Sequence, residues 1–124
     1  MGAIARIGAV SLVGRDPIEL GRFYRELLDS AVLFESPELM VLRGDGVTLT
    51  IGRVKDHRPP EWAATDEPQL AHLELHVADL DEAEGRAVEL GAVRAERQPE
   101  PEHRRVLLDP AGHPFALTVP ALRM

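Results

Sequence analysis

The second half of the chain repeats the order of elements found in the first half. Asp16 follows an apolar stretch and precedes a helical pattern, and Asp79 does the same 63 residues later. Near the end of each half, a turn containing Gly46 or Gly112 leads into a final apolar stretch. Such repetition predicts two copies of one supersecondary unit. Positions that differ between the copies are where a function has been added or lost.

The first half reads as one strand, one helix and three further strands. Asp16 is placed to cap the helix, and Pro17 suits the first helical position, where a backbone N–H has no partner to lose. Apolar residues then recur at helical spacing, at Leu20, Phe23, Tyr24, Leu27 and Leu28. Runs of β-forming residues predict strands at 5–13, 31–35, 39–43 and 47–53, with a hairpin turn at 44–46.

The second half follows the same plan. Asp79 is the predicted cap, Ala83, Ala87 and Leu90 form the apolar stripe, and Gly91 ends the helix. Strands are expected at 70–77, 93–97, 104–108 and 114–119. Residues 54–68 lose periodicity and contain several prolines, which is typical of a linker. We therefore expect one α+β domain made of two βαβββ modules, at residues 1–53 and 69–124, joined by the linker 54–68.

Alternation along the strand at 70–77 assigns its two faces. Leu73, Leu75 and Val77 point to one side, which we expect to pack against the helix. His72, Glu74 and His76 point to the other side, toward solvent or an internal cavity.

Composition narrows the class of protein. A length of 124 residues fits one domain, and the net charge of −7 argues against a nucleic-acid surface or an anionic membrane. The absence of cysteine excludes disulfides, thiolate nucleophiles and cysteine-bound zinc, and it suits a reducing compartment. No apolar run reaches the roughly 18 to 20 residues of a membrane span, and no signal peptide is evident. We expect a cytoplasmic protein with no nucleic-acid or membrane partner.

The ordered motifs resemble the vicinal oxygen chelate superfamily, which includes glyoxalase I, bleomycin-resistance proteins and extradiol dioxygenases. The resemblance is strongest to its glyoxalase-like domain branch and extends over essentially the whole chain. The segments that carry it are Asp16–Pro17, Phe23–Leu28, Pro59–Trp62, His72–Asp81, Glu89–Ala92 and Leu108–Phe115. The resemblance implies eight strands that curl into a cup around a small-molecule site, and it implies a homodimer.

Members of this superfamily that use a metal bind it with His, Gln or Glu on the first and last strands of each module. The corresponding positions here are Ala9, Thr50, His72 and Ala116. Three of these four side chains do not bind a divalent ion tightly, and metal centres need several protein donors. The sequence therefore predicts that the inherited metal site is lost and that no cofactor is bound. A new site at His72, Glu74 and His76 is a weaker alternative, because alternate residues of one strand lie about 7 Å apart.

The candidate ligand-binding residues face the predicted cavity or lie beside it. They are Ser11, Thr50, Trp62, His72, Glu74 and His76, with small walls from Ala9, Val13, Ala116 and Thr118. Trp62 is the one tryptophan and reads either as a lid over the ligand or as a hydrophobic plug that packs its loop. The remaining histidines have simpler interpretations, with His113 in a turn and His57 and His103 in contact with solvent.

Two functions remain open on this evidence. The first is a metal-independent binding protein for an organic metabolite or antibiotic, which needs a shaped pocket and a few placed polar groups. The second is an enzyme, such as a lyase, isomerase or dioxygenase-like protein, with or without a divalent metal. It would use His72 and Glu74 as general acid and base, because histidine titrates near neutral pH. We favour binding, since neither residue has an evident catalytic partner.

Overall fold

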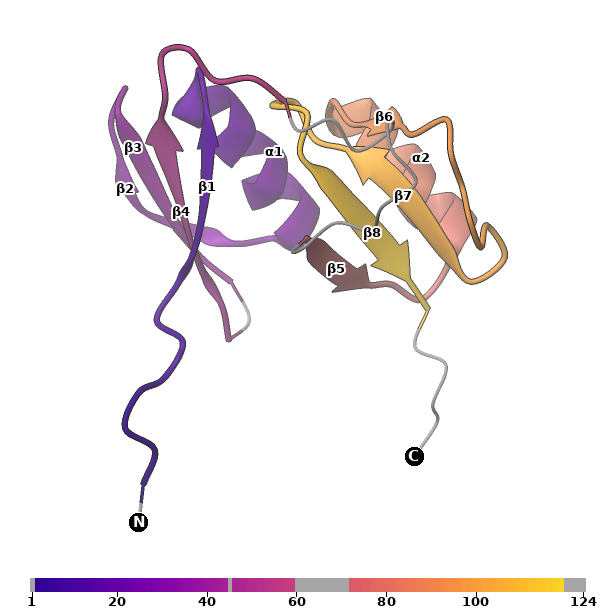
Figure 1. The fold of residues 1–124 in the computed structure, drawn as a ribbon, viewed down its shortest axis with the longest axis horizontal. Helices are drawn as coiled ribbons and strands as arrows, with labels where there is room; N and C mark the ends of the chain where they lie inside the picture. The colour runs from indigo at the N-terminus through magenta and orange to yellow at the C-terminus, as the bar shows by residue number, and fades with distance from the viewer. Residues whose placement is uncertain (1, 45, 60–71, 120–124) are drawn as a thin grey trace. The chain divides into compact units, whose positions relative to one another are not determined.

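The computed structural model describes residues 2–44, 46–59 and 72–119. It divides into two compact units, Met1–His57 and Arg58–Met124. Each unit has a strand, a helix and three more strands (Figure 1). The first contains β1 (Val10–Gly14), α1 (Pro17–Leu28), β2 (Ala31–Glu35), β3 (Leu39–Arg43) and β4 (Thr48–Arg53), and the second contains β5 (Leu73–His76), α2 (Leu80–Leu90), β6 (Val93–Arg94), β7 (Arg104–Leu108) and β8 (Pro114–Thr118). The predicted α+β fold with two βαβββ modules is confirmed. The linker predicted at 54–68 stays a prediction, since much of it lies outside the described residues.

The two sheets have the same topology. Within the described residues the strand orders are β1-β4-β3-β2 and β5-β8-β7-β6. The first and last strands of each unit pair in parallel, and the other neighbours pair antiparallel. The registers also correspond, because Ser11 lies opposite Thr50 in one sheet and Glu74 lies opposite Ala116 in the other. The duplication read from the sequence is therefore present in the pairing of individual residues.

Both helices begin and end where their terminal residues predict. The Asp16 carboxylate accepts hydrogen bonds from the backbone N–H groups of Ile18 and Glu19, at 3.1 and 3.2 Å. Asp79 accepts from the N–H of Glu82 at 3.0 Å. These bonds satisfy donors that a helix leaves free at its first turn. At the end of α2, Gly91 has a φ of 125°, a conformation that favours glycine.

Each helix covers one face of the sheet in its own unit. Helix α1 packs on β3 and β4 with buried Leu20, Phe23 and Tyr24, and α2 packs on β7 and β8 with buried Leu80 and Ala87. The strands contribute alternate apolar side chains to the same core, which include Met40, Leu42, Leu49, Ile51, Leu107, Phe115 and Leu117. Leu73 and Leu75 lie on this side in the second unit and are half-buried, while His72, Glu74 and His76 are exposed. The predicted faces of this strand are confirmed.

Strand β1 is shorter at its start than the sequence predicted. A strand was expected over 5–13, but β1 pairs with β4 only from Val10, which lies opposite Leu49. Because β4 itself begins at Thr48, the residues before Val10 pair with no strand in the part of the chain that the structure describes. The side chains of Ile4 and Ile7 are consequently 105% and 90% exposed.

Strand β6 is also shorter than the expected 93–97, and a side chain explains the difference. The Gln98 amide nitrogen donates to the backbone carbonyls of Ala95 and Val106, at 2.8 and 2.7 Å. The Gln98 amide oxygen accepts from the N–H of Val106 at 2.9 Å. The Val106 N–H thus bonds to a side chain instead of a backbone carbonyl, while the Val106 carbonyl also accepts from the Ala95 N–H at 3.1 Å, and β6 ends at Arg94. The strand expected at 70–77 is likewise limited to Leu73–His76 in the described residues.

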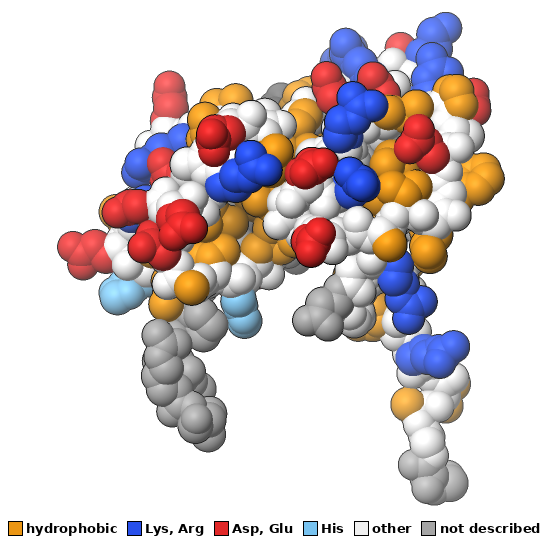
Figure 2. Space-filling model, turned by 180° about the vertical axis from the view of Figure 1, so that it is seen from behind, with side chains coloured by type: hydrophobic (Ala, Val, Ile, Leu, Met, Phe, Trp, Pro, Cys, Tyr) orange, Lys and Arg blue, Asp and Glu red, His pale blue; other side chains and the backbone are white. Residues whose placement is uncertain are grey.

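Charged side chains of both signs are interspersed on the face shown in Figure 2. Neither helix in the described part of the chain is long and apolar enough to cross a membrane.

The opposite faces of β5 predict opposite responses to truncation. We expect Leu75→Ala to lower the free energy of unfolding by about 2 kcal/mol, near the lower end for buried leucines because Leu75 is half-buried. The neighbouring Glu74→Ala should change it by no more than about 0.5 kcal/mol, as is usual for surface positions. Urea denaturation of both variants measures this difference. A larger loss from Glu74→Ala than from Leu75→Ala would reverse the assignment of the faces.

Candidate functional site

The sheet faces opposite the helices carry the polar side chains that the core does not use. We call them the open faces. On the open face of the first unit, the hydroxyls of Ser11 and Thr50 lie 2.6 Å apart and form a hydrogen bond. They belong to the paired strands β1 and β4, so the bond links the two parallel strands. The structure thus brings together two of the predicted ligand-binding residues, and their role in binding stays a prediction.

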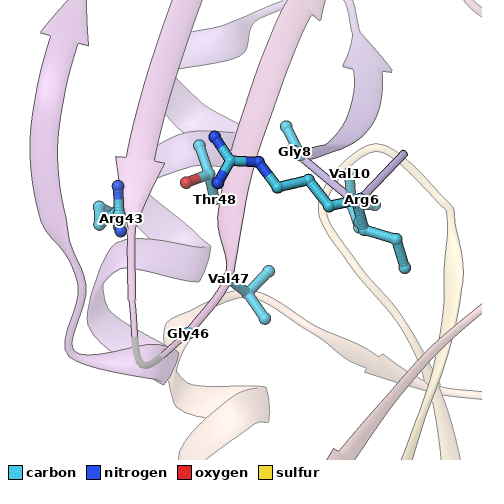
Figure 3. Close-up of a pocket in the computed structure, with 9 residues that line it drawn as sticks. Arg6, Gly8, Val10, Arg43, Gly46, Val47 and Thr48 are labelled. Carbon is cyan, nitrogen blue, oxygen red and sulfur yellow. The ribbon is translucent and has the colours of Figure 1, made fainter. Parts of the chain in front are cut away.

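A pocket of about 470 Å³ lies at the end of this face, next to the β3–β4 turn (Figure 3). Its polar lining includes Arg6 from the segment before β1, and Arg43 and Thr48, which are register partners in β3 and β4. Val47 adds an apolar wall. Sequence reasoning missed this pocket because Arg6 is far from the turn in sequence. The one available signal was the symmetric placement of Arg43 and Thr48 about the hairpin.

On the open face of the second unit, β5 presents His72, Glu74 and His76. All three residues are exposed. The closest ionic contact among them joins His76 Nε2 and Glu74 Oε2 at 4.0 Å, which is too long for a hydrogen bond. The alternation of the strand therefore places all three as predicted, but it does not bring them into one tight cluster.

Two adjacent arginines in β7 point to opposite faces of the second sheet. Arg105 faces α2, where its guanidinium lies 3.0 Å from Asp81 and 3.0 Å from Glu84. The hydrogen bond to Glu84, together with Asp81, raises the pKa of Arg105 above its usual value. Arg104 points to the open face, because its register partner is Thr118 and the next pair on that side is Val106 and Ala116. Asp81, in the first turn of α2, therefore ties the helix to the sheet.

Arg104 reaches across the open face to His72. Its Nη2 atom lies 3.3 Å from His72 Nε2. A guanidinium carries only donors, so His72 Nε2 accepts in this contact. Arg104 Nε and the Thr118 hydroxyl are buried, and neither has a hydrogen-bond partner within the part of the chain that the structure describes. Sequence reasoning missed Arg104 because an arginine at the start of a strand is usually solvated. Its even spacing from Val106 and Leu108 was the signal that it shares their face.

The described residues do not fit the metal centre that the superfamily implies. The four expected positions hold Ala9, Thr50, His72 and Ala116, which supply one imidazole, one hydroxyl and two methyl groups. Within 2–44, 46–59 and 72–119, no group of three or more His, Cys, Asp or Glu side chains is placed to hold a metal ion. The imidazole nitrogen that contacts Arg104 is also engaged with a fixed positive charge.

The remaining candidates have mixed outcomes. The prediction that His57 is solvated is wrong, because His57 is only 8% exposed. The chain turns at this residue: the His57 N–H donates to the Val54 carbonyl at 3.1 Å, and the His57 carbonyl accepts from Arg15 Nε at 3.1 Å. His103 is exposed, as predicted. His113 lies in a turn that the buried Asp109 carboxylate stabilises by accepting from the His113 N–H at 3.0 Å. Trp62 lies outside the described residues.

Known proteins share this fold at low sequence identity. The fosfomycin resistance protein FosX from Listeria monocytogenes is 14% identical with a TM-score of 0.73, and the match covers 97% of both chains. A glyoxalase-related enzyme from Fulvimarina pelagi is 21% identical with a TM-score of 0.70, covering 94% of this chain and 89% of that one. The bleomycin-binding protein of Streptomyces verticillus, solved with copper(II)-bleomycin, is 18% identical with a TM-score of 0.61, covering 95% and 99%.

A search of curated protein sequences gave no match. The profile of the glyoxalase-like domain matches residues 9–118, which include every described helix and strand. The chain belongs to the glyoxalase-like domain family.

Proposed function

We propose that the chain is a metal-independent binding protein for a small organic molecule, an organic metabolite or an antibiotic. The observation that carries the proposal is the composition of the open faces. They present hydroxyl, imidazole and carboxylate groups that the core does not use, at Ser11, Thr50, His72 and Glu74, while the positions of the superfamily's metal ligands offer one imidazole. A few placed polar groups beside small side chains suit recognition of an organic ligand.

The fold relatives support binding as one outcome of this architecture. The bleomycin-binding protein was solved in complex with copper(II)-bleomycin, an organic ligand that carries its own metal. FosX and the Fulvimarina pelagi protein are named as a resistance protein and an enzyme, so the fold alone does not choose between binding and catalysis. The choice rests on the side chains of this chain.

The alternative is an enzyme that uses the region of His72 and Glu74 as general acid and base. The exposed side chains on one strand face favour it. Against it, His72 Nε2 contacts Arg104, and the Glu74 carboxylate is 4.0 Å from His76. A general base works within hydrogen-bond reach of its proton and gains from a partner that orients it. Because neither residue is oriented in this way, we favour binding.

We also propose a homodimer that is located in the cytoplasm. The edge strand β2 exposes three consecutive apolar side chains, with Val32, Leu33 and Phe34 exposed by 38%, 58% and 52%. Its outer edge has no strand partner in the described residues, and a partner subunit would protect it. The lack of cysteine supports a reducing compartment.

The proposal predicts that purified protein carries little metal. Because the four expected positions hold Ala9, Thr50, His72 and Ala116, we expect far less than one divalent ion per chain. Elemental analysis of untagged protein measures this content. A content of about one tightly held Zn, Ni, Fe or Mn ion per chain would overturn the proposed metal independence.

The function itself is tested by titration calorimetry in the presence of EDTA. The probes are metal-free bleomycin, fosfomycin and a panel of aromatic natural products. We expect at least one to bind, and the double variant His72→Ala/Glu74→Ala to weaken that binding about tenfold or more while the melting temperature stays unchanged. The variant Trp62→Ala should weaken it by roughly thirtyfold if Trp62 covers the ligand, and should only lower stability if Trp62 is a plug.

The matched control is His103→Ala, which removes another exposed imidazole of the second unit and should leave affinity unchanged. Binding that needs added metal, or no binding by any probe at millimolar concentration, would contradict the proposed function.

The dimer is tested by sedimentation equilibrium. We expect the wild type to sediment with twice the chain mass and Phe34→Glu to sediment as a monomer, because a buried unpaired carboxylate at the interface is costly. Val88→Glu is the control, since Val88 on α2 is also an exposed apolar residue, at 45%. A monomeric wild type, or a Phe34→Glu variant that remains dimeric, would argue against an interface at β2.

A further inference from the structure

We propose that Arg104, Thr118 and His72 form an oxyanion-binding site on the open face of the second unit. The ligand they take carries a carboxylate or a similarly charged oxygen group. This inference rests on the proposed function, because it names the chemical class of the small molecule bound there.

The first step is the unused hydrogen-bonding capacity of Arg104. A guanidinium has five N–H donors, and His72 Nε2 accepts one of them, at 3.3 Å. The Nε–H is buried and has no partner within the described residues. A buried donor without a partner destabilises the folded chain, and a charged donor does so more strongly. The folded chain therefore holds a donor that a ligand would satisfy.

Thr118 supplies a second unused group beside the first. Its hydroxyl is buried and has no partner within the part of the chain that the structure describes. Thr118 and Arg104 are register partners in the antiparallel pair β8 and β7, so their side chains start about 5 Å apart on the same face. A hydroxyl donates readily to an oxyanion. Two neighbouring strands thus place two donors without a described partner on the same face of the sheet.

Within residues 2–44, 46–59 and 72–119, no carboxylate pairs with the charge of Arg104. The adjacent Arg105 lies 3.0 Å from Asp81 and 3.0 Å from Glu84, whereas no ion pair joins Arg104 to any described carboxylate. Glu74 shares the open face, but its nearest ionic partner is His76 at 4.0 Å. In a chain of net charge −7, an arginine without an ion pair to any described carboxylate is a suitable partner for an anionic ligand.

His72 fixes the direction of the guanidinium. A guanidinium only donates, so His72 Nε2 is the acceptor in this contact. The contact restrains Arg104 on the open face. The planar guanidinium is then oriented to donate two parallel hydrogen bonds to a carboxylate.

The test follows the side-chain Nε–H signal of Arg104 by proton–nitrogen NMR. The probes are benzoate and phenylphosphonate, with benzamide as the neutral analogue of benzoate. The signal is assigned by its loss in Arg104→Gln. We expect both anions to shift it saturably and benzamide to leave it unchanged. Arg104→Gln should weaken benzoate binding about tenfold or more, and Thr118→Val should weaken it severalfold.

Arg86→Gln is the matched control, because Arg86 is an exposed arginine on α2 and its loss should leave affinity unchanged. The backbone amide spectrum checks that each variant is folded. If Arg104→Gln unfolds, Arg104→Lys replaces it, because lysine keeps the positive charge but lacks the planar guanidinium. An Nε–H signal that no anion shifts overturns the oxyanion site. Benzamide that binds as well as benzoate overturns it too, but leaves the proposed binding function standing.

Discussion

The structure depends on the two-residue alternation of its strands. In each unit one helix packs on one face of a four-stranded sheet, and alternate apolar side chains of β3 and β4, and Leu107, Phe115 and Leu117 of β7 and β8, are buried on that face. Stability is therefore supplied by residues such as Ile51 and Leu117, while their neighbours Thr50 and Thr118 are free of that role. Because a one-residue shift in register would exchange the two sets, the core fixes the position of every side chain on the open face.

Duplication gave the chain two such faces, and the two have diverged. The positions of Ser11 and Thr50 in the first unit correspond to those of Glu74 and Ala116 in the second. In the first unit the two hydroxyls form a hydrogen bond with each other at 2.6 Å, so each satisfies part of the other's hydrogen-bonding capacity. In the second unit Ala116 has no polar group, and Arg104 reaches over the sheet to His72 instead. Corresponding backbone pairing thus carries a hydrogen-bonded pair of hydroxyls in one unit and, in the other, donors without a partner among the described residues.

Features encoded locally in the sequence were predictable, and features that depend on tertiary contacts were not. The caps at Asp16 and Asp79 and the faces of β5 follow from short-range spacing, and the structure confirms them. The burial of His57 follows from the turn at Val54–His57 and from the hydrogen bond between Arg15 and the His57 carbonyl. No rule of residue spacing indicates either contact. At the early end of β6, the Gln98 side chain accepts from the backbone N–H of Val106, and strand propensity does not encode such a contact. The contact between Arg104 and His72 joins residues 32 positions apart and depends on the whole sheet, so spacing indicates only the face on which Arg104 lies.

A guanidinium in place of a metal changes what the proposed site selects. A metal centre needs several protein donors in fixed geometry, and it binds its ligand only while the ion is present. The ion accepts neutral as well as charged oxygen groups of a ligand. The Arg104 guanidinium offers only hydrogen-bond donors, so the ligand must bring the acceptors. A ligand that brings no acceptors leaves the Arg104 Nε–H and the Thr118 hydroxyl buried and without a partner among the described residues, and this lowers its affinity. A site of this kind discriminates by charge and by acceptor geometry, and it does so independently of the supply of any metal.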